Sequence, residues 1–355
     1  MKLRTLTAVL ACGMLLCACS ANPDDLNAES IDTEQNAIEE QDTTEQTTDT
    51  DAEAEGENLA DESTDSGETG GALYESFLNN QAKVLVDTKN DHGEYMTLAD
   101  ANGTECTLDE LTKVLTDAYA KQAGVDVTAD SVEYGYFDCG SDGVKELAIK
   151  INTSMGQEIV AIKEVDGALK LIYAGDERDR SELVLNDNGS IIRSGNGGWG
   201  AFSTEKSVID ADGNWNFVYS AYVTEYIEPG TPRGDLYFNG QTHSLPQDMN
   251  LDDSYAFIDF DFNNTLEDGT DDVYSYSKII ENPGNSSGSR EYYYGEFNDA
   301  NTTYDSSNSL YQFLENEGVK PVSVSEADKM IADKEKSVGL TDGSNAKVVT
   351  WQILK

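Results

Sequence analysis

Turn-forming dipeptides recur at a steady interval through the middle of this sequence, with successive separations of 24, 22 and 24 residues. Asp-Gly and Asn-Gly accept the positive φ that tight hairpin turns need. Each interval has room for two strands of about 8 to 10 residues and a return turn. The turns should therefore lie on the same edge of one antiparallel meander, unless chance spacing in an Asp- and Gly-rich chain produced the pattern. The dipeptides are Asp142-Gly143, Asp166-Gly167, Asn188-Gly189 and Asp212-Gly213.

Side chains between Val132 and about Phe238 alternate between apolar and polar, which is the period of a half-buried strand. Two helices are expected before this region. The first covers about residues 73 to 78, and the second covers 107–123. Thr107 with Glu110 three residues later forms a capping-box pattern, and Gly124 follows the end. The apolar stripe of the second helix is Leu108, Leu111, Leu115 and Ala118.

The last third of the chain is less regular. An alternating run over 256–262 and a tyrosine-rich run, Tyr292 to Tyr294, are each typical of a strand. We expect one helix through Leu310, Phe313 and Leu314, another that begins at Ser325 with Asp328 completing its cap, and a final strand over 348–354. The predicted fold is α+β, a long antiparallel β-meander with flanking N- and C-terminal helices.

The first residues have the layout of an export signal. Lys2 and Arg4 precede an apolar stretch over 6–16, which is shorter than the roughly 20 residues that span a bilayer. The run Leu16-Cys17-Ala18-Cys19-Ser20 then resembles the bacterial lipobox, in which the modified cysteine follows a small residue. The resemblance implies a signal peptide over 1–18 and a diacylglycerol on Cys19. The alternative is an ordinary signal peptide with incidental cysteines.

Residues 20 to 72 have the composition of a disordered tether. They hold 18 Asp or Glu residues, no Lys or Arg and no aromatic residue. Such a segment cannot bury enough apolar surface to offset its ordering entropy. We therefore expect a lipidated Cys19 with an acidic tether over 19–72, and one globular extracellular domain over 73–355 with a potential sub-boundary near 240.

Three features together resemble a group of acidic lipoproteins of gut-dwelling anaerobic Firmicutes. They are the lipobox with its tether, the opening Tyr74-Glu75-Ser76-Phe77-Leu78, and the run Phe137-Asp138-Cys139-Gly140-Ser141-Asp142-Gly143-Val144-Lys145-Glu146-Leu147. The resemblance implies a layout and a habitat, and the lipobox within it implies that a lipid holds the chain to the membrane. It implies no activity.

The third of these runs also resembles the Asp-rich calcium loop of integrin-type (FG-GAP/VCBS-like) repeats. Asp138, Asp142 and Glu146 match its first, fifth and ninth positions, but Gly140 replaces an oxygen ligand. Ile149 stands where an EF-hand needs a bidentate Glu, which excludes that motif. A calcium site and a hairpin turn whose carboxylates accept local N–H bonds both remain open.

Several chemistries lack the residues that they need. The chain has two histidines, His92 and His243, no G-x-S-x-G elbow, no zinc-ligand spacing and no Walker loop. Its net charge of −45 and the lack of a basic cluster argue against nucleic acid as a partner. Paired carboxylates suit a glycosidase, but in so acidic a chain some pair meets the spacing by chance.

Aromatic residues in the expected strands offer a better candidate for ligand binding. Rings on an exposed sheet face can stack on sugars, and nearby Asp and Asn side chains can bond their hydroxyls. Alternation also requires about half of such rings to point into the core. The candidate ligand-binding residues are Trp199, Trp215, Tyr292 and Tyr294, and the neighbouring Tyr219, Tyr222 and Tyr226 share one strand face only if a bulge intervenes.

We expect a non-enzymatic, lipid-anchored surface protein that binds an extracellular ligand, with a glycan or another surface protein as candidates and no required cofactor besides a potential calcium ion. The alternatives are an extracellular hydrolase that uses paired carboxylates and an accessory subunit of a surface protein complex. Cys106 and Cys139 remain after export, and their spacing leaves open a disulfide or two separate buried thiols.

Overall fold

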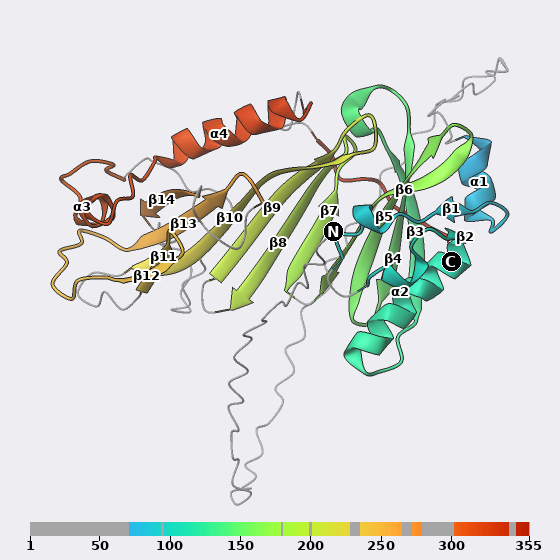
Figure 1. The fold of residues 1–355 in the computed structure, drawn as a ribbon, viewed down its shortest axis with the longest axis horizontal. Coiled ribbons are helices and arrows are strands. Elements are labelled where there is room, and N and C mark those ends of the chain that lie inside the picture. Colours follow the sequence, from blue (N-terminus) through green and yellow to red (C-terminus); the bar gives the residue numbers. More distant parts are fainter. Residues whose placement is uncertain are drawn as a thin grey trace, which may run out of the picture. The chain divides into compact units, whose positions relative to one another are not determined.

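The computed structural model describes residues 71–93, 96–178, 180–198, 201–227, 235–264, 272–278, 302–340 and 346–354. These residues belong to one compact unit and form helices together with mostly antiparallel strands, which confirms the predicted α+β class (Figure 1). The helices are α1 (Ala72–Leu78), α2 (Leu108–Ala123), α3 (Ser309–Asn316) and α4 (Val324–Ser337).

The first sheet has seven strands in the order β15-β3-β4-β5-β6-β1-β2. Consecutive hairpins build its centre, and short β1 joins the outer edge of β6 in parallel, with Val84 opposite Leu169. The strands are β1 (Val84–Leu85), β2 (Glu105–Cys106), β3 (Ala129–Phe137), β4 (Glu146–Thr153), β5 (Gly156–Val165), β6 (Ala168–Arg178) and β15 (Gln352–Ile353).

The second sheet has six strands in the order β14-β13-β10-β9-β8-β7, and a separate hairpin pairs β11 with β12. The predicted antiparallel meander is therefore divided between two sheets instead of forming one. Because β1 takes the free edge of β6, the chain leaves the first sheet after Arg178 and starts a second one. Its strands are β7 (Ser181–Leu185), β8 (Ser190–Gly198), β9 (Ala201–Ile209), β10 (Trp215–Ile227), β11 (Asp235–Phe238), β12 (Gln241–Ser244), β13 (Tyr255–Asp261) and β14 (Val273–Lys278).

The recurring turns nevertheless gather at one end of the strands, as predicted. The Asp138 N–H donates to the Asp187 carbonyl at 2.8 Å, which joins the β3–β4 turn to the β7–β8 turn. A Cβ on Gly140 would lie 2.5 Å from Ala211, so the β9–β10 turn abuts the same place. Gly140 has φ +79, which a side chain rarely adopts. Glycine is required there by both conformation and close approach.

Helix α2 packs on the first sheet through the predicted stripe, of which Leu108, Leu111 and Leu115 are fully buried (Figure 1). Both hydrogen bonds of the Thr107–Glu110 capping box are present, and Gly124 ends the helix in the left-handed conformation. Ala118 is only partly buried, and Tyr119 completes the buried stripe instead. α1 confirms the first predicted helix.

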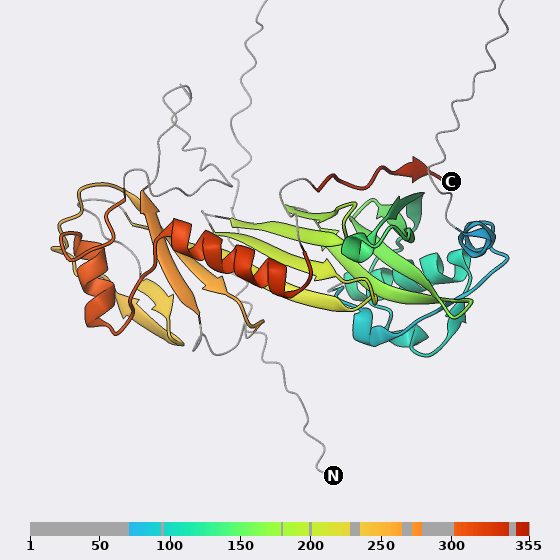
Figure 2. The same ribbon diagram turned by 90° about the horizontal axis from the view of Figure 1, so that it is seen from above.

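Helix α4 runs along one face of the second sheet (Figures 1 and 2). It buries Val324 and Ala327 against strand residues that include Ile258 and Phe260. The capping box is formed by Ser323 and Glu326, so the prediction of a start at Ser325 was two residues late. Helix α3 confirms the predicted helix through Leu310 and Leu314, and both side chains are buried.

The C-terminal segment connects the edges of both sheets. The Val349 N–H donates to the Leu185 carbonyl of β7 at 3.0 Å, and the Leu354 N–H donates to the Val132 carbonyl of β3 at 2.8 Å. The predicted single strand over 348–354 was therefore too long, since only β15 pairs as a strand. A core between the sheets takes side chains from both, including Phe137, Ile159, Leu185 and Ile209.

Candidate functional site

Strand β10 presents its tyrosines to opposite faces of the second sheet. Tyr219 packs beneath α4, where burial, reinforced by the charges of Glu335 and Asp328, raises its pKa to about 12. Tyr222 points to the other face and is 44% exposed. The bulges in β10 lie at Phe217/Tyr219 and Val223/Glu225, so none separates the two tyrosines. Tyr222 is thus the candidate for contact with a ligand, and Tyr219 is a core residue.

Carboxylates lie beside Tyr222 on the same face. Across the strands, Tyr222 is opposite Ser203 on β9 and Asp259 on β13, and these three residues with Asp261 define the Tyr222 patch. Asp259 Oδ1 is buried and has no hydrogen-bond partner. Burial, followed by the nearby charges of Asp272 and Asp261, raises the pKa of Asp259 to about 7. The patch therefore joins an exposed ring to an unused acceptor.

Trp215 lies away from this patch, at the start of β10. Its ring stacks on His92 with centroids 4.2 Å apart and packs on the core between the sheets. A protein side chain therefore occupies one face of the ring, which argues against Trp215 as a sugar platform. The other predicted ligand-binding residues, Trp199, Tyr292 and Tyr294, lie outside the described residues.

His92 lies among ionisable side chains and contacts Tyr173 of β6 and Arg193 of β8. Arg193 Nη2 donates to the His92 carbonyl at 3.1 Å, and the His92 ring also stacks on Tyr173 at 5.5 Å. His92 Nε2 is buried without a hydrogen-bond partner. Burial lowers the pKa of His92, and the positive charge of Arg193 lowers it further. His92 is therefore a neutral, packed residue rather than a solvated base.

Glu158 on β5 lies near this cluster and is completely buried. Neither of its carboxyl oxygens has a hydrogen-bond partner. Burial, and then the charges of Asp176 and Asp91, raise the pKa of Glu158 well above its usual range. One feature of the sequence could have identified Glu158 as an unusual buried residue. Glu158 occupies a position that should be apolar in the alternation with Val160 and Ile162, whose side chains face α2.

The carboxylates of the calcium-like loop are engaged in bonds within the protein. Asp138 accepts the N–H groups of Asp142 and Gly143, each at 2.9 Å, and Asp142 accepts that of Val144 at 2.8 Å. Glu146 is buried, accepts the Cys139 N–H at 2.9 Å and forms an ion pair with Lys163. In the described part of the chain, no three or more His, Cys, Asp or Glu residues are grouped to hold a metal ion.

The two remaining cysteines are unpaired and buried. Cys106 belongs to the core beneath α2, and Cys139 belongs to the core between the sheets. Burial, with the Glu146 charge, raises the pKa of the Cys139 thiol. Both thiols therefore have the character of small apolar core residues.

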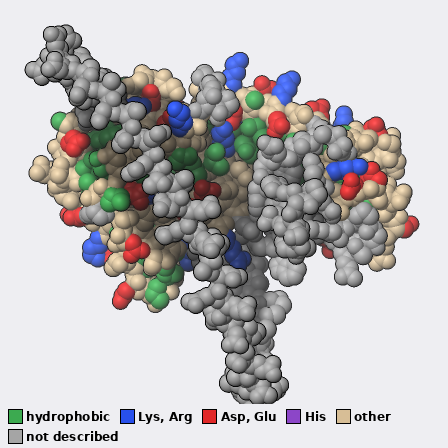
Figure 3. Space-filling model, turned by 180° about the vertical axis from the view of Figure 1, so that it is seen from behind, with side chains coloured by type: hydrophobic (Ala, Val, Ile, Leu, Met, Phe, Trp, Pro, Cys, Tyr) green, Lys and Arg blue, Asp and Glu red, His purple; other side chains and the backbone are tan. Residues whose placement is uncertain are grey.

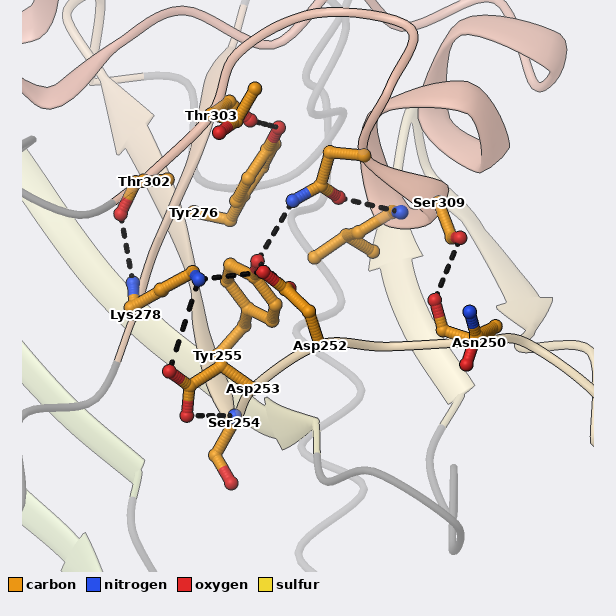
Figure 4. Close-up of polar contacts among 12 residues, drawn as sticks. Asn250, Asp252, Asp253, Ser254, Tyr255, Tyr276, Lys278, Thr302, Thr303 and Ser309 are labelled. Atoms are coloured by element: carbon orange, nitrogen blue, oxygen red, sulfur yellow. Dashed lines mark hydrogen bonds and ion pairs between the residues drawn. The ribbon is translucent and has the colours of Figure 1, made fainter.

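A second polar network joins the segment around 302–311 to β13 and β14 (Figure 4). Lys278 Nζ lies 2.7 Å from Asp252 Oδ2, and the Tyr255 hydroxyl donates to Asp252 Oδ1 at 2.5 Å. Asn308 donates to the Tyr255 hydroxyl at 2.8 Å and also caps α3. The Lys278 hydrogen bond, followed by that of Tyr255, lowers the pKa of Asp252. These side chains bond to one another, as expected of residues that fix a segment in place.

Neither histidine is placed for nucleophilic catalysis. His243 Nδ1 lies 3.0 Å from Glu317 Oε2, and its ring stacks on Phe238 at 3.8 Å. His92 contacts aromatic rings and Arg193, and among the described residues no hydrogen bond joins either imidazole to a serine hydroxyl. The serine–histidine pair that a triad requires is therefore lacking at both positions.

Comparison with known proteins gives no further guide to the site. No protein-family model matches the chain, and no curated protein and no solved structure matches it. Of the helices in the described ranges, none is long and apolar enough to cross a bilayer. Figure 3 shows basic side chains standing apart among acidic ones on the described part of the back face, which offers a polyanion little continuous positive surface.

Proposed function

We propose that this chain is an exported surface protein, held to the membrane by a lipid on Cys19, whose folded domain binds a glycan at the Tyr222 patch. The observation that carries the glycan part is the exposed Tyr222 ring beside the unpartnered Asp259 oxygen. A sugar ring can stack on the tyrosine while its hydroxyls donate to the carboxylates. The Tyr222 ring is exposed, and the Asp259 oxygen, although buried, has no hydrogen-bond partner within the protein.

The anchoring part of the proposal rests on the first 72 residues. The apolar stretch, the lipobox-like run and the acidic segment over 20–72 suit a signal, a lipidation site and a tether in that order. Each buried methylene of a lipid contributes about 0.8 kcal/mol, so two or more acyl chains hold a protein firmly. Mass spectrometry of the N-terminal peptide tests this directly, since a diacylglycerol on Cys19 is expected and an unmodified Cys19 would refute it.

The glycan part is tested on the full-length protein with a panel of soluble polysaccharides in affinity gels. At least one polysaccharide should retard the wild-type protein and the Tyr237→Ala variant equally. Tyr237 is a matched control because it is 53% exposed and lies on the separate β11–β12 hairpin. Tyr222→Ala should lose the retardation. Absence of retardation by the whole panel would remove the glycan and favour an accessory subunit, which predicts a protein partner instead.

One observation favours a second candidate, an extracellular glycoside hydrolase. Asp259, with its raised pKa, is a carboxyl that can hold a proton near neutral pH, and Asp261 follows it on the same strand face. A protonated acid beside a second carboxylate is the arrangement that glycoside hydrolysis uses. This candidate predicts that reducing ends appear in the same panel and disappear in Asp259→Asn. Binding without release would exclude it for those polysaccharides.

A further inference from the structure

Three carboxyl groups converge on the face of the first sheet that α2 covers. Glu158 on β5 is directly opposite Asp176 on β6, and Asp91 forms a parallel bridge with Ala174, two residues earlier on β6. A Cβ on Gly93 would lie 3.2 Å from Asp91 Oδ1 and 3.6 Å from Asp176 Oδ1. The carboxylates of Asp91 and Asp176 therefore meet around Gly93.

Two of these carboxylates hold the segment that carries His92. Asp91 accepts the Leu98 N–H at 2.7 Å, the Thr97 hydroxyl at 2.9 Å and the Gly93 N–H at 3.2 Å. Asp176 accepts the Met96 N–H at 2.8 Å. In each of these bonds a carboxyl oxygen is the acceptor, so Asp91 and Asp176 both fix the segment in place.

Glu158 differs from its two neighbours. It is 0% exposed, and both of its oxygens lack a hydrogen-bond partner. A buried carboxylate without donors is very unfavourable, and two nearby negative charges make it more so. The group is tolerated in this place as a neutral acid.

The charged groups around Glu158 come from three elements. Asp176 on β6 and Asp91 disfavour its ionisation, and Arg193 on β8 opposes them. Arg193 also donates to the His92 carbonyl, and Arg178, further along β6, donates to the Tyr119 hydroxyl of α2 at 2.9 Å. The residue opposite Glu158 on β4 is Ile151, which supplies no polar group. Negative charge therefore dominates the immediate surroundings.

We propose that Glu158 is a proton-operated latch: while it is neutral, Asp91 and Asp176 keep the described residues 91–93 and 96–98 against the first sheet, and loss of its proton releases them. A third negative charge is relieved most directly if Asp91 and Asp176 move away, and their movement breaks the bonds to Met96 and Leu98. His92 is on this segment, so its stack on Trp215 would loosen in the same step.

The sign of the effect follows from the direction of the Glu158 shift. A carboxyl whose pKa is raised by folding stabilises the closed state fully below its unfolded value, and that stabilisation is lost as the pH rises toward the folded pKa. Alkaline conditions should therefore open the latch, and acidic conditions should close it.

Hydrogen–deuterium exchange on the full-length protein tests the latch. After correction for intrinsic rates, the Met96 and Leu98 amides should lose protection by about tenfold or more as the pH is raised from about 5 through the range in which the protein stays folded. The Leu354 amide, bonded to β3 in the same sheet, should keep its protection. Glu158→Gln is close in size to the acid and cannot ionise, so it should abolish the change. Asp176→Asn removes a neighbouring charge, so it should move the loss of protection to lower pH.

Three outcomes would overturn the proposal. In the first, the protection of Met96 and Leu98 stays the same throughout that pH range. In the second, Glu158→Gln keeps the full pH response. In the third, the Leu354 amide loses protection together with the other two, which would indicate global unfolding. The first and third outcomes are measured on the wild-type protein alone, so the proposal can be tested even if a variant fails to fold.

Discussion

Val349 packs directly on the backbone of Gly135, so closely that a Cβ at position 135 would lie 2.4 Å from Val349 Cγ1 and 2.8 Å from the Thr350 carbonyl oxygen. Gly135 is in β3 of the first sheet, and Val349 is bonded to β7 of the second. The contact therefore joins the two sheets through the C-terminal segment. Through this contact the C-terminal segment covers the core between the two sheets.

Gly135→Ala should lower the free energy of unfolding by about 1 to 3 kcal/mol, because the added methyl overpacks a site bounded by backbone. Gly195→Ala is a suitable control, since its nearest contact is the small Ser203 hydroxyl at 3.2 Å. Urea denaturation of both variants measures the difference. Equal stability of the two would show that the C-terminal segment is not tightly packed on β3.

The buried ion pair between Lys163 and Glu146 gives a second prediction. Glu146 is 0% exposed and Lys163 is 13% exposed. Lys163→Met leaves a buried carboxylate without its partner, so it should destabilise the protein by about 3 to 5 kcal/mol. Lys113→Met, which breaks the exposed pair with Asp117, should change stability by less than about 1 kcal/mol. The double variant Glu146→Gln/Lys163→Met should recover part of the loss, and no recovery would contradict the pairing.

The loop at Asp138 gives a third prediction, about calcium. Because Asp138, Asp142 and Glu146 accept bonds from within the protein, millimolar calcium should leave the melting temperature of the wild-type protein unchanged. Asp138→Asn weakens the bonds to Asp142 and Gly143, so it should lower the melting temperature with or without calcium. A calcium-induced rise that disappears in Asp138→Asn/Asp142→Asn would instead establish the calcium site.

The dependence of stability on pH gives a fourth prediction. Burial raises the pKa of Asp259 from 3.8 to about 7 and that of Glu177 from 4.5 to about 7. The stability that these neutral acids provide is complete below their unfolded values and is lost as the pH rises to about 7. The melting temperature should therefore fall between about pH 4 and pH 7. Asp259→Asn should reduce this slope, and Asp117→Asn at an exposed position should not. An unchanged slope in Asp259→Asn would contradict the shift.

The sequence predicted local elements well and their assembly less well. The capping box at Thr107 and the turn dipeptides are set by residues within a few positions of each other, so both could be predicted. The start of α4 could not, because Ser323-x-x-Glu326 and Ser325-x-x-Asp328 fit the same cap pattern. Burial of Val324 and Ala327 under the second sheet selects the first of these.

The division into two sheets depends on contacts between distant parts of the chain. Val84 is opposite Leu169 on the edge of β6, and Val349 is beside Leu185. Both pairs are far apart in the sequence, whereas hydrophobic periodicity relates only residues that are close in the sequence. The candidate site also depends on contacts between distant parts of the chain. Alternation places Tyr222 on the face opposite Tyr219, but its proximity to Asp259 depends on the β10–β13 pairing, which is non-local.

The measurement that tests the proposed function most directly is the affinity of the full-length protein for the best-retained polysaccharide, compared among three tyrosine variants. Stacking depends on the ring, so Tyr222→Phe should keep most of the affinity, whereas Tyr222→Ala should weaken it by about tenfold or more. Tyr237→Ala should bind as the wild-type protein does. Equal binding by Tyr222→Ala and Tyr237→Ala would show that the Tyr222 patch is not the binding site.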